Sequence, residues 1–459
     1  MRTVVVGAGM AAARLADQLA AAGRPVTLLG DEPHPPYNRI LLSAVLEGSH
    51  DARGLALPLD GRVDLRLDSR VVEVHTTERE VELADRSRVA YDVLVLATGS
   101  IPTLPPIRGL VRLDGRLHER VHAFRSLADC LRLDAAVPGA RTAAVVGGGL
   151  LGLQVARALA RRGLEVELVE GGEHLLRSQV DAKAGAILAR DLRRLGTSVY
   201  TGARATRLTD DGPRTSLSLD NGAVLSDLDL VVLTAGGRPS TALARRAGLD
   251  VRRGVVVDQH LRTSDPHVHA IGDCAQHRGQ VTGFVPPAWE QAGLLAAHLS
   301  GADVTYDGAR TVARLRATDL DVAVLGDPER AEGQVVEMTN PVVGSHRKLV
   351  VRDGVIVAAT LVGDLSRVGL ITQHYDRGTV LGPAEPGALL MADRPTQPAY
   401  LADDAEVCAC AGVTAGRLRG CASLEEARSV TRATTGCGGC ADTVRALVAE
   451  PAPLEGTRS

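Results

Sequence analysis

Four cysteines lie close together near the end of the sequence, in the pattern C-x-C followed by C-x2-C. They are Cys408, Cys410, Cys437 and Cys440, in a chain of 459 residues with seven cysteines. The chain begins with an apolar run that leads into a glycine turn, so we expect no signal peptide and a cytoplasmic protein. Structural disulfides are rare in that compartment, and the four thiols therefore indicate a metal or redox centre. Four thiolates suit either Zn²⁺ or a [2Fe–2S] cluster.

The first stretch that could bind a dinucleotide is "TVVVGAGMAAARLADQLAAAGRPVTLLGDE", which has the order strand, glycine turn, helix, strand. Gly7, Gly9 and Ala12 fit G-x-G-x-x-A, in which the glycines make the tight turn and admit a pyrophosphate, and the alanine allows close helix packing. Asp31 and Glu32 follow the second strand, and the sequence leaves open which of them reaches a ribose. The alternative is a small-residue turn without a ligand.

The second such stretch is "TAAVVGGGLLGLQVARALARRGLEVELVE". Gly147, Gly149 and Gly152 give a full G-x-G-x-x-G between a strand and a helix. Glu170 closes the next strand, and a carboxylate there accepts a hydrogen bond from a 2′-hydroxyl but repels a 2′-phosphate. The two glycines that follow Glu170 supply no arginine for a phosphate. The sequence therefore predicts NADH as the coenzyme, with NADPH less favoured.

Three further motifs accompany the two turns: "LVLATGSIP", "LTAGGRP" and "HVHAIGDCA". The set resembles the flavoprotein reductases that hold FAD and a nicotinamide nucleotide in two dinucleotide-binding folds. The resemblance implies FAD in the first fold, with Asp273 on its ribityl chain. It also implies cofactor contacts at Val71, Ala97, Thr98, Gly99, Arg125, Gly236 and Val285.

The segment "PHPPYNRILLS" resembles a loop in the flavoprotein part of assimilatory nitrite reductases and in the electron-transfer subunit of assimilatory nitrate reductase. Ferredoxin reductases of this class carry a lysine where Ala44 stands, which makes the nitrite-reductase branch the closer match. The resemblance implies that Arg39 pairs with the FAD pyrophosphate, the alternative being a surface arginine. Gln154 stands where relatives have Glu near the nicotinamide, and it is the candidate catalytic residue. No C-x4-C pair stands beside the first turn, which disfavours a disulfide-reductase mechanism.

The cysteine-rich tail resembles the small [2Fe–2S] module of bacterioferritin-associated ferredoxin. A flavin that receives two electrons from NADH needs a one-electron outlet, which favours the cluster over a structural zinc. We expect Cys408 and Cys410 on one side of an extended segment. We also expect a capping box over residues 423–426, a helix end at Gly436 and a further helix from Ala441.

The predicted fold class is α/β, with two Rossmann-like domains, an α+β interface domain and a small helical iron–sulfur domain. Residues 305–392 alternate in polarity and contain an Asp353-Gly354 turn, which predicts an antiparallel sheet. The predicted boundaries are 1–108 with 239–304 for FAD, 109–238 for NAD(P)H, 305–392 for the interface domain, 393–405 for a linker and 406–446 for the cluster.

The composition and the missing motifs argue against several classes of function. The formal net charge of −3 argues against nucleic-acid binding, and no apolar segment reaches the ~20 residues that span a bilayer. The C-x5-C and C-x3-C pairs of a siroheme-linked [4Fe–4S] cluster are missing. We therefore predict an NADH-oxidising electron-transfer protein for a nitrate or nitrite reductase partner. The alternatives are a ferredoxin or rubredoxin reductase, or a nucleotide-binding redox adaptor with a zinc tail. A homodimer is left open.

Overall fold

The computed structural model describes residues 2–212, 214–308, 312–317, 320–391, 401–436 and 439–449. Cys437 and residues 393–400 of the predicted linker lie outside these ranges. The contacts divide the chain into two compact units. The first comprises residues 1–105, 122–136 and 233–311, and the second comprises 106–121, 137–232 and 312–459. The finer division predicted from the sequence stays a prediction.

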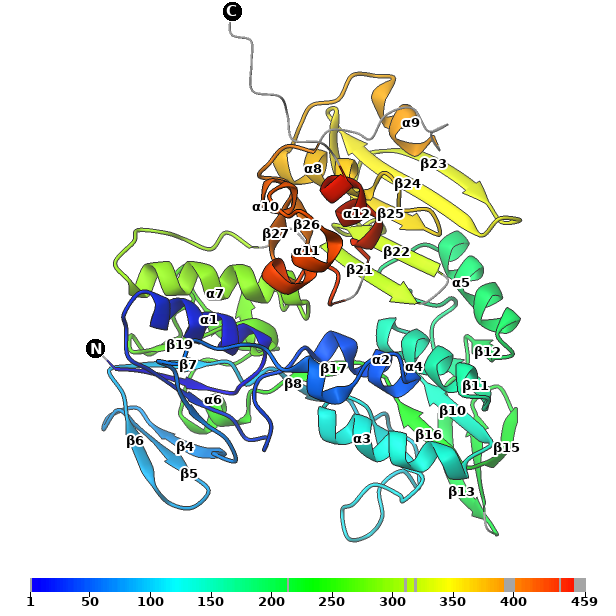
Figure 1. The fold of residues 1–459 in the computed structure, drawn as a ribbon. Helices are drawn as coiled ribbons and strands as arrows, with labels where there is room; N and C mark the ends of the chain where they lie inside the picture. The colour runs from blue at the N-terminus through cyan, green and yellow to red at the C-terminus, as the bar shows by residue number, and fades with distance from the viewer. Residues whose placement is uncertain are drawn as a thin grey trace, which may run out of the picture. The chain divides into compact units, whose positions relative to one another are not determined.

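The first unit contains a five-stranded parallel sheet of order β19-β7-β1-β2-β3. Its strands are β1 (Thr3–Val6), β2 (Val26–Leu29), β3 (Asp64–Arg66), β7 (Val93–Leu96) and β19 (Val268–Ala270). Every residue of the central strands β1 and β7 is buried, because other elements cover this parallel sheet on both faces. Helices α1 (Met10–Ala21) and α7 (Val285–Leu299) pack against each other (Figure 1).

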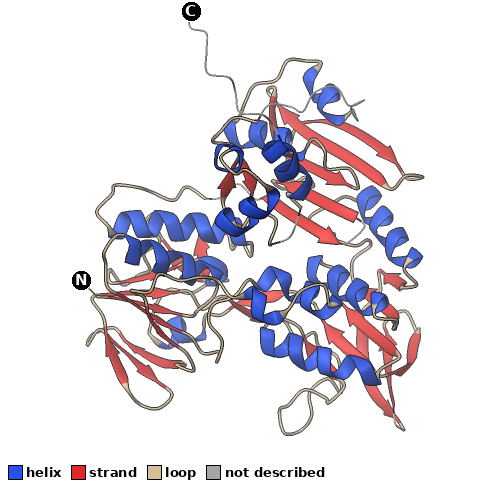
Figure 2. Ribbon diagram, in the orientation of Figure 1, coloured by secondary structure: helices blue, strands red, loops and turns tan. Residues whose placement is uncertain are grey.

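A second five-stranded sheet has the order β12-β11-β10-β16-β9. Its strands are β9 (Val121–Ala123), β10 (Thr142–Val146), β11 (Glu165–Glu170), β12 (Ser198–Thr201) and β16 (Leu230–Leu233), and its helices are α4 (Leu150–Arg161) and α5 (Ala182–Arg194). Strand for strand it repeats the first sheet, except that its edge strand β9 precedes the glycine turn whereas β19 follows it. Figure 2 shows the alternation of strands and helices that confirms the predicted α/β class.

Each unit also contains smaller elements. The antiparallel strands are β4 (Val71–His75), β5 (Glu80–Leu83) and β6 (Arg88–Ala90) in one sheet and β13 (Ala205–Asp211), β14 (Arg214–Leu219) and β15 (Val224–Leu228) in another. Two-stranded pairs are β8 (Ser100–Pro102) with β17 (Gly237–Pro239) and β18 (Val255–Val257) with β20 (Ala275–His277). The short helices are η1 (Arg39–Leu41), α2 (Leu42–Glu47), η2 (Ala52–Leu55), α3 (Leu127–Ala136), η3 (Val137–Gly139), α6 (Ala242–Arg246) and η4 (Gly272–Cys274).

An antiparallel sheet of order β21-β22-β25-β24-β23 follows in the second unit. Its strands are β21 (Val312–Ala317), β22 (Leu320–Leu325), β23 (Gln334–Asn340), β24 (Ser345–Arg352) and β25 (Val355–Val362). Asp353 and Gly354 both have positive φ between β24 and β25, which confirms the predicted two-residue turn. Helix α8 (Val368–Arg377) ends at Gly378 in the left-handed region, and α9 (Glu385–Leu390) follows it.

The tail folds around a small apolar core of its own. Its elements are β26 (Glu406–Cys408), β27 (Val413–Thr414), α10 (Ala415–Arg419), α11 (Leu424–Thr431) and α12 (Ala441–Ala449). Ser423 caps α11 by accepting from the Glu426 N–H at 3.1 Å, and α12 begins at Ala441, as predicted.

Two local predictions about the tail were wrong. Strand β26 ends at Cys408, so Cys410 lies in the tight turn of a hairpin and not in an extended segment. Helix α11 ends before Arg432, which has φ of 60°, and not at Gly436. The left-handed residue at the helix C-terminus stops the α-helical hydrogen bonding four residues earlier than the glycine would.

Candidate cofactor sites

The first glycine turn is built for close approach of another segment. Gly7 has φ of +100°, and a Cβ there would lie 2.4 Å from the carbonyl oxygen of Ala97. Gly9 is the N-cap of α1, where its carbonyl oxygen accepts from Ala13 at 2.9 Å, and Ala12 is fully buried. Gly7 therefore permits both the turn and the contact with the "ATG" segment, which the sequence placed at the FAD.

Two motifs far apart in the sequence pair beside this turn. Strand β8 follows Gly99 and runs antiparallel to β17, which follows Gly236. The Thr98 hydroxyl donates to the Ser240 carbonyl at 2.8 Å, and the Thr103 N–H donates to the Gly236 carbonyl at 2.9 Å. The structure thus brings together Ala97, Thr98, Gly99 and Gly236.

Asp273 forms the centre of a polar cluster. The Ser100 hydroxyl donates to Asp273 Oδ2 at 2.7 Å, and the Arg125 guanidinium pairs with the same oxygen at 2.6 Å. Gly272 has φ of +73°, and its N–H donates to the side-chain oxygen of buried Gln291 at 2.7 Å. Sequence reasoning missed Ser100 and Gln291. The position of Ser100 directly after "ATG" was an available signal, whereas Gln291 had none beyond being polar in an apolar helix.

Two helix N-termini meet at the Gly272 turn. A Cβ at Gly272 would lie 3.4 Å from the Cβ of Ala11 in α1 and 3.9 Å from that of Ala288 in α7. Val285 is the first residue of α7, and the indole N–H of Trp289 donates to the Met10 carbonyl at 3.2 Å. Paired helix N-termini favour an anion such as a pyrophosphate.

The two acids after β2 have different surroundings. Asp31 is exposed, whereas Glu32 accepts from the Tyr37 hydroxyl at 2.8 Å and forms an ion pair with Arg39. The Tyr37 hydroxyl in turn accepts from the Leu127 N–H at 2.8 Å, and burial raises the pKa of Tyr37 well above its ordinary value. The structure therefore gives Glu32 a fixed position and joins it to Arg39. Val71 is half-buried at the start of β4.

The second glycine turn is tied directly to its acid. Gly147 has φ of +118°, Gly149 is the N-cap of α4, and Gly152 is buried within that helix. The Gly148 N–H donates to one Glu170 carboxylate oxygen at 2.5 Å, and the Gly172 N–H donates to the other at 2.6 Å. Two backbone donors hold the carboxylate in one orientation.

Two arginines that the sequence prediction overlooked lie beside this acid. A Cβ at Gly172 would lie 2.9 Å from the Arg177 side chain, and a Cβ at Gly171 would lie 3.0 Å from that of Arg204. Both arginines are exposed, and neither guanidinium has an ion pair with any residue that the structure describes. Gln154 is half-buried on α4.

The described cysteines of the tail share one core. Cys408 is 2% exposed, Cys440 is 3% exposed and half-buried Cys410 packs against the same cluster. Cys440 stands immediately before α12, whose free backbone N–H groups favour a nearby thiolate. Three of the four predicted ligands therefore share one small core, and Cys437 lies outside the described residues.

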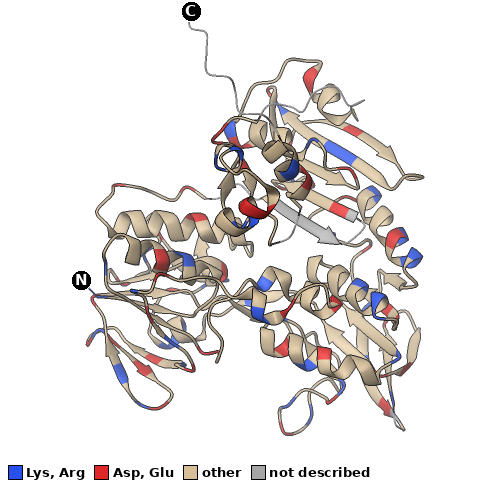
Figure 3. Ribbon diagram, viewed as in Figure 1, with Lys and Arg blue, Asp and Glu red and all other residues tan. Residues whose placement is uncertain are grey.

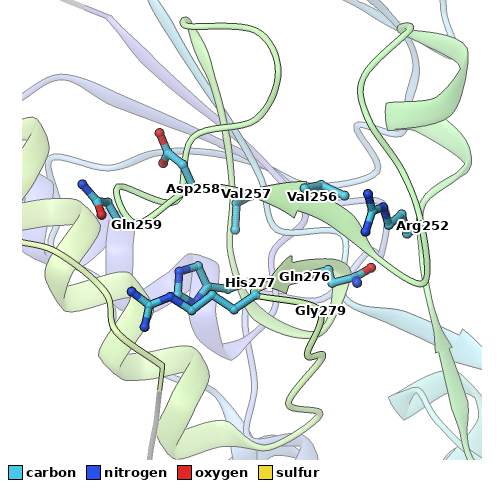
Figure 4. A pocket seen from close by; sticks show the side chains of 9 residues that line it. Arg252, Val256, Val257, Asp258, Gln259, Gln276, His277 and Gly279 are labelled. Carbon is cyan, nitrogen blue, oxygen red and sulfur yellow. The ribbon is translucent and has the colours of Figure 1, made fainter.

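A cavity of about 420 Å³ lies in the first unit, between β18 and residues 276–279. Figure 4 shows Arg252 and Asp258 on opposite sides of it, with His277 along its floor. Asp258 is already satisfied by Arg262, at 3.1 Å. None of the residues predicted to bind a cofactor lines this cavity, so it carries no part of the proposed chemistry.

Figure 3 shows positions of Lys and Arg interspersed with positions of Asp and Glu along the described elements. Among the helices that the structure describes, none is long and apolar enough to cross a membrane.

Two parallel nucleotide-binding sheets, each with its glycine turn, and a polar cluster around Asp273 define a flavoprotein oxidoreductase with two dinucleotide folds. The chain belongs to the pyridine nucleotide-disulphide oxidoreductase family, whose pattern matches residues 1–292. It is an NAD(P)H-dependent FAD oxidoreductase.

Relatives match almost the whole chain. The chain is 33% identical to nitrite reductase [NAD(P)H] of Bacillus subtilis over 97% of its own length and 57% of that protein. It is 29% identical to the assimilatory nitrate reductase electron transfer subunit of the same organism, over 97% of its own length and 59% of that protein. The chain therefore spans somewhat more than half the length of these relatives. Among solved structures, a ferredoxin reductase from Rhodopseudomonas palustris is similar at a TM-score of 0.75 and 28% identity, over 83% of this chain and 96% of that one.

Proposed function

We propose that this chain oxidises NADH and passes the electrons singly, through a [2Fe–2S] cluster in its tail, to a nitrate or nitrite reductase partner. The observation that carries the proposal is the presence in one chain of two glycine turns and a small tail core that contains Cys408 and Cys440, with Cys410 packed against it. The likeness to a nitrite reductase and to a nitrate reductase electron-transfer subunit supports the choice of partner.

The residues of the first unit fit FAD. Gly7 and Gly9 leave the backbone open for a pyrophosphate, and the N-termini of α1 and α7 favour its charge. The Asp273 carboxylate, fixed by Ser100 and Arg125, has lone pairs left to accept from a polyhydroxyl chain. Bound FAD would supply the chemistry that accepts a hydride and releases single electrons.

The second unit would position the nicotinamide nucleotide. Glu170 is held by two N–H groups, so a ribose hydroxyl can bind it without rearrangement of the carboxylate. Arg177 and Arg204 lie next to the two glycines that follow Glu170, from where an arginine could pair with a 2′-phosphate. We infer that Glu170 favours NADH and that the two arginines keep NADPH as a second coenzyme. Gln154 would present a neutral amide near the nicotinamide.

The tail would hold the one-electron outlet. Cys408, Cys410 and Cys440, with Cys437, supply the four thiolates that either a [2Fe–2S] cluster or Zn²⁺ requires. Because a flavin fed by NADH must release electrons one at a time to an iron or molybdenum partner, we propose the cluster. Iron and sulfide analysis of anaerobically purified protein tests this, and stoichiometric zinc without iron would overturn it.

The electron route is tested by mixing the holoprotein with NADH under anaerobic conditions. The flavin absorbance should bleach first, and a reduced-cluster EPR signal should follow. A flavin that stays oxidised would instead support a nucleotide-binding adaptor.

The likeness to a ferredoxin reductase favours one second candidate, a reductase for a small diffusible carrier. Copurification separates the two, because a stable complex with a molybdenum or siroheme protein supports the first proposal. Rapid reduction of free ferredoxin without such a complex supports the second.

A further inference from the structure

Outside the nucleotide and cysteine sites, three potential metal ligands meet where α5 packs against the C-terminal sheet (Figure 1). Asp181 is the N-cap of α5, Glu337 lies on β23 and His346 lies on β24. One ligand atom from each lies within 4.8 Å of the other two. We propose that these three residues form a divalent-cation site that joins the second nucleotide fold to the C-terminal sheet.

The environment of His346 is the main reason for the proposal. Its side chain is fully buried, and its Nε2 has no aligned hydrogen bond, although it lies 3.2 Å from Asp181 Oδ2. Its Nδ1 lies 2.8 Å from the Thr339 hydroxyl. If Nδ1 donates to Thr339, as the second nitrogen of a metal-bound imidazole usually donates to a neighbouring oxygen, Nε2 directs a lone pair at the carboxylate. Two facing lone pairs need a cation between them.

Asp181 is prepared for the same role. Its Oδ1 accepts from the Ala184 N–H at 2.9 Å, which leaves Oδ2 directed toward His346 and Lys348. The Ala184 N–H and Lys348 therefore fix the position of the carboxylate before any ion binds.

The charge balance shows which group a cation would replace. Three carboxylates, on Asp181, Glu329 and Glu337, face two ammonium groups, on Lys183 and Lys348. The Lys183 side chain is 58% exposed, and among the described residues it pairs with Glu337 and acts through space on Asp181, so it can turn away into water. Lys348 is 13% exposed and stays between Asp181 and Glu329. Once Lys183 leaves, two negative charges remain, which a divalent ion neutralises.

One imidazole and two carboxylates suit a borderline or hard divalent ion such as Mn²⁺, Fe²⁺ or Zn²⁺, with water in the remaining positions. Mn²⁺ is the probe of choice here because it avoids the thiolates of the tail. Titration of the full-length holoprotein with Mn²⁺ alone, followed by the EPR signal of the free ion, should reveal one saturable site.

Three variants test the site, two that should weaken Mn²⁺ binding and one that should tighten it. His346→Ala should weaken Mn²⁺ binding more than tenfold, and Thr339→Val should weaken it about tenfold by releasing the ring. Lys183→Ala should tighten binding, since it removes the competing cation from an exposed position. His50→Ala, at an exposed histidine of the first unit, is the control and should change nothing.

Lys183→Ala keeps the test decisive even if the His346 variant does not fold. Tighter binding in Lys183→Ala supports the site. Unchanged or weaker binding in that variant, equal binding in a folded His346→Ala variant, or no saturable binding at millimolar Mn²⁺ overturns it.

Discussion

The two glycine turns share their fold, but they differ in which residue must be a glycine to avoid a clash between the turn and the strand end. In the first turn the middle residue is Ala8 and the strand end is Gly30, where a Cβ would lie 2.9 Å from that of Ala8. In the second turn the middle residue is Gly148, where a Cβ would lie 2.8 Å from that of Glu170 at the strand end. Each pair therefore has room for one Cβ and not for two.

This exclusion explains where each turn keeps its acid. A glycine in the middle of the second turn leaves room for Glu170 at the strand end, and the Gly148 N–H donates to the Glu170 carboxylate. An alanine in the first turn forces a glycine at the strand end, so the acid comes later. There Tyr37 and Arg39 orient Glu32 in place of backbone donors. The same kind of acid is thus supported by backbone in one site and by side chains in the other.

The largest effect is expected from Gly7→Ala in the first turn. A positive φ costs an L-residue roughly 1–2 kcal/mol, and overlap with the Ala97 carbonyl adds roughly 1–3 kcal/mol. We expect the free energy of unfolding to fall by about 2–5 kcal/mol and the purified protein to lose most of its flavin. Denaturant unfolding and flavin absorbance measure both.

The control is Gly54→Ala, at an exposed glycine with negative φ and no atom within 4 Å of the added Cβ. It should leave stability and flavin content unchanged. Wild-type flavin content in Gly7→Ala would contradict the close approach of Ala97.

The next prediction tests whether the turn residue and the strand-end residue together have room for only one Cβ. Gly148→Ala should destabilise the protein by roughly 1–3 kcal/mol, because the new Cβ would lie 2.8 Å from the Glu170 Cβ and 2.7 Å from the flexible end of Leu175. Adding Glu170→Gly, which copies the first turn, should restore much of that stability while NADH binding stays impaired. A double-mutant cycle by thermal unfolding measures the coupling, and additive effects of the two changes would show that the pair does not compete for space.

The sequence predicted the features that depend on local backbone rules. Gly7 and Gly147 could be recognised because each stands between a strand pattern and a helix pattern. Both have the positive φ that a tight glycine turn requires. The Asp353-Gly354 turn could also be predicted locally, because Asp-Gly between two alternating segments is typical of a two-residue hairpin turn. Cys410 shows the limit, since C-x-C fits a strand or a hairpin turn, and only Gly412 with its φ of 61° selects the turn.

The polar cluster around Asp273 was beyond local reasoning. Ser100, Arg125 and Asp273 are separated by up to 173 residues, and their meeting depends on how β8 pairs with β17. Arg204 was overlooked for a similar reason, because it reaches Gly171 from the loop after β12. Long-range contacts of this kind follow from the packed fold, and no spacing in the sequence encodes them.

A third prediction concerns Arg177 and Arg204, the two arginines beside Glu170 in the second turn. Arg177→Ala and Arg204→Ala should each lower kcat/KM for NADPH by about tenfold, the loss of one charge-assisted phosphate contact, and leave that for NADH nearly unchanged. Steady-state kinetics with both coenzymes measures the ratio. Arg194→Ala, another exposed arginine of the same unit, controls for the change in net charge. Equal losses with both coenzymes would place the arginines away from the 2′-phosphate.

The smallest effect concerns a feature that the two sheets share. The edge strands β19 and β9 have the same sequence, Val-His-Ala, with His269 and His122 in the middle. Burial lowers the pKa of His269 to about 4, and burial, with Arg132, also lowers the pKa of His122. Both histidines are therefore neutral in the folded protein at neutral pH.

A lowered folded-state pKa gives the sign of the pH dependence. Between about pH 4 and pH 6.5 the unfolded chain binds a proton at His269 that the folded chain does not, so stability rises with pH across this window and is complete above it. At pH 5.5 this single histidine should cost about 1 kcal/mol relative to pH 7.5. His269→Asn, which keeps a donor for the His260 carbonyl but cannot titrate, should flatten the pH dependence of denaturant unfolding by that amount. His122→Asn should act with the same sign, because the two sheets bury the residue at equivalent positions; a steeper pH dependence in either variant would break the equivalence.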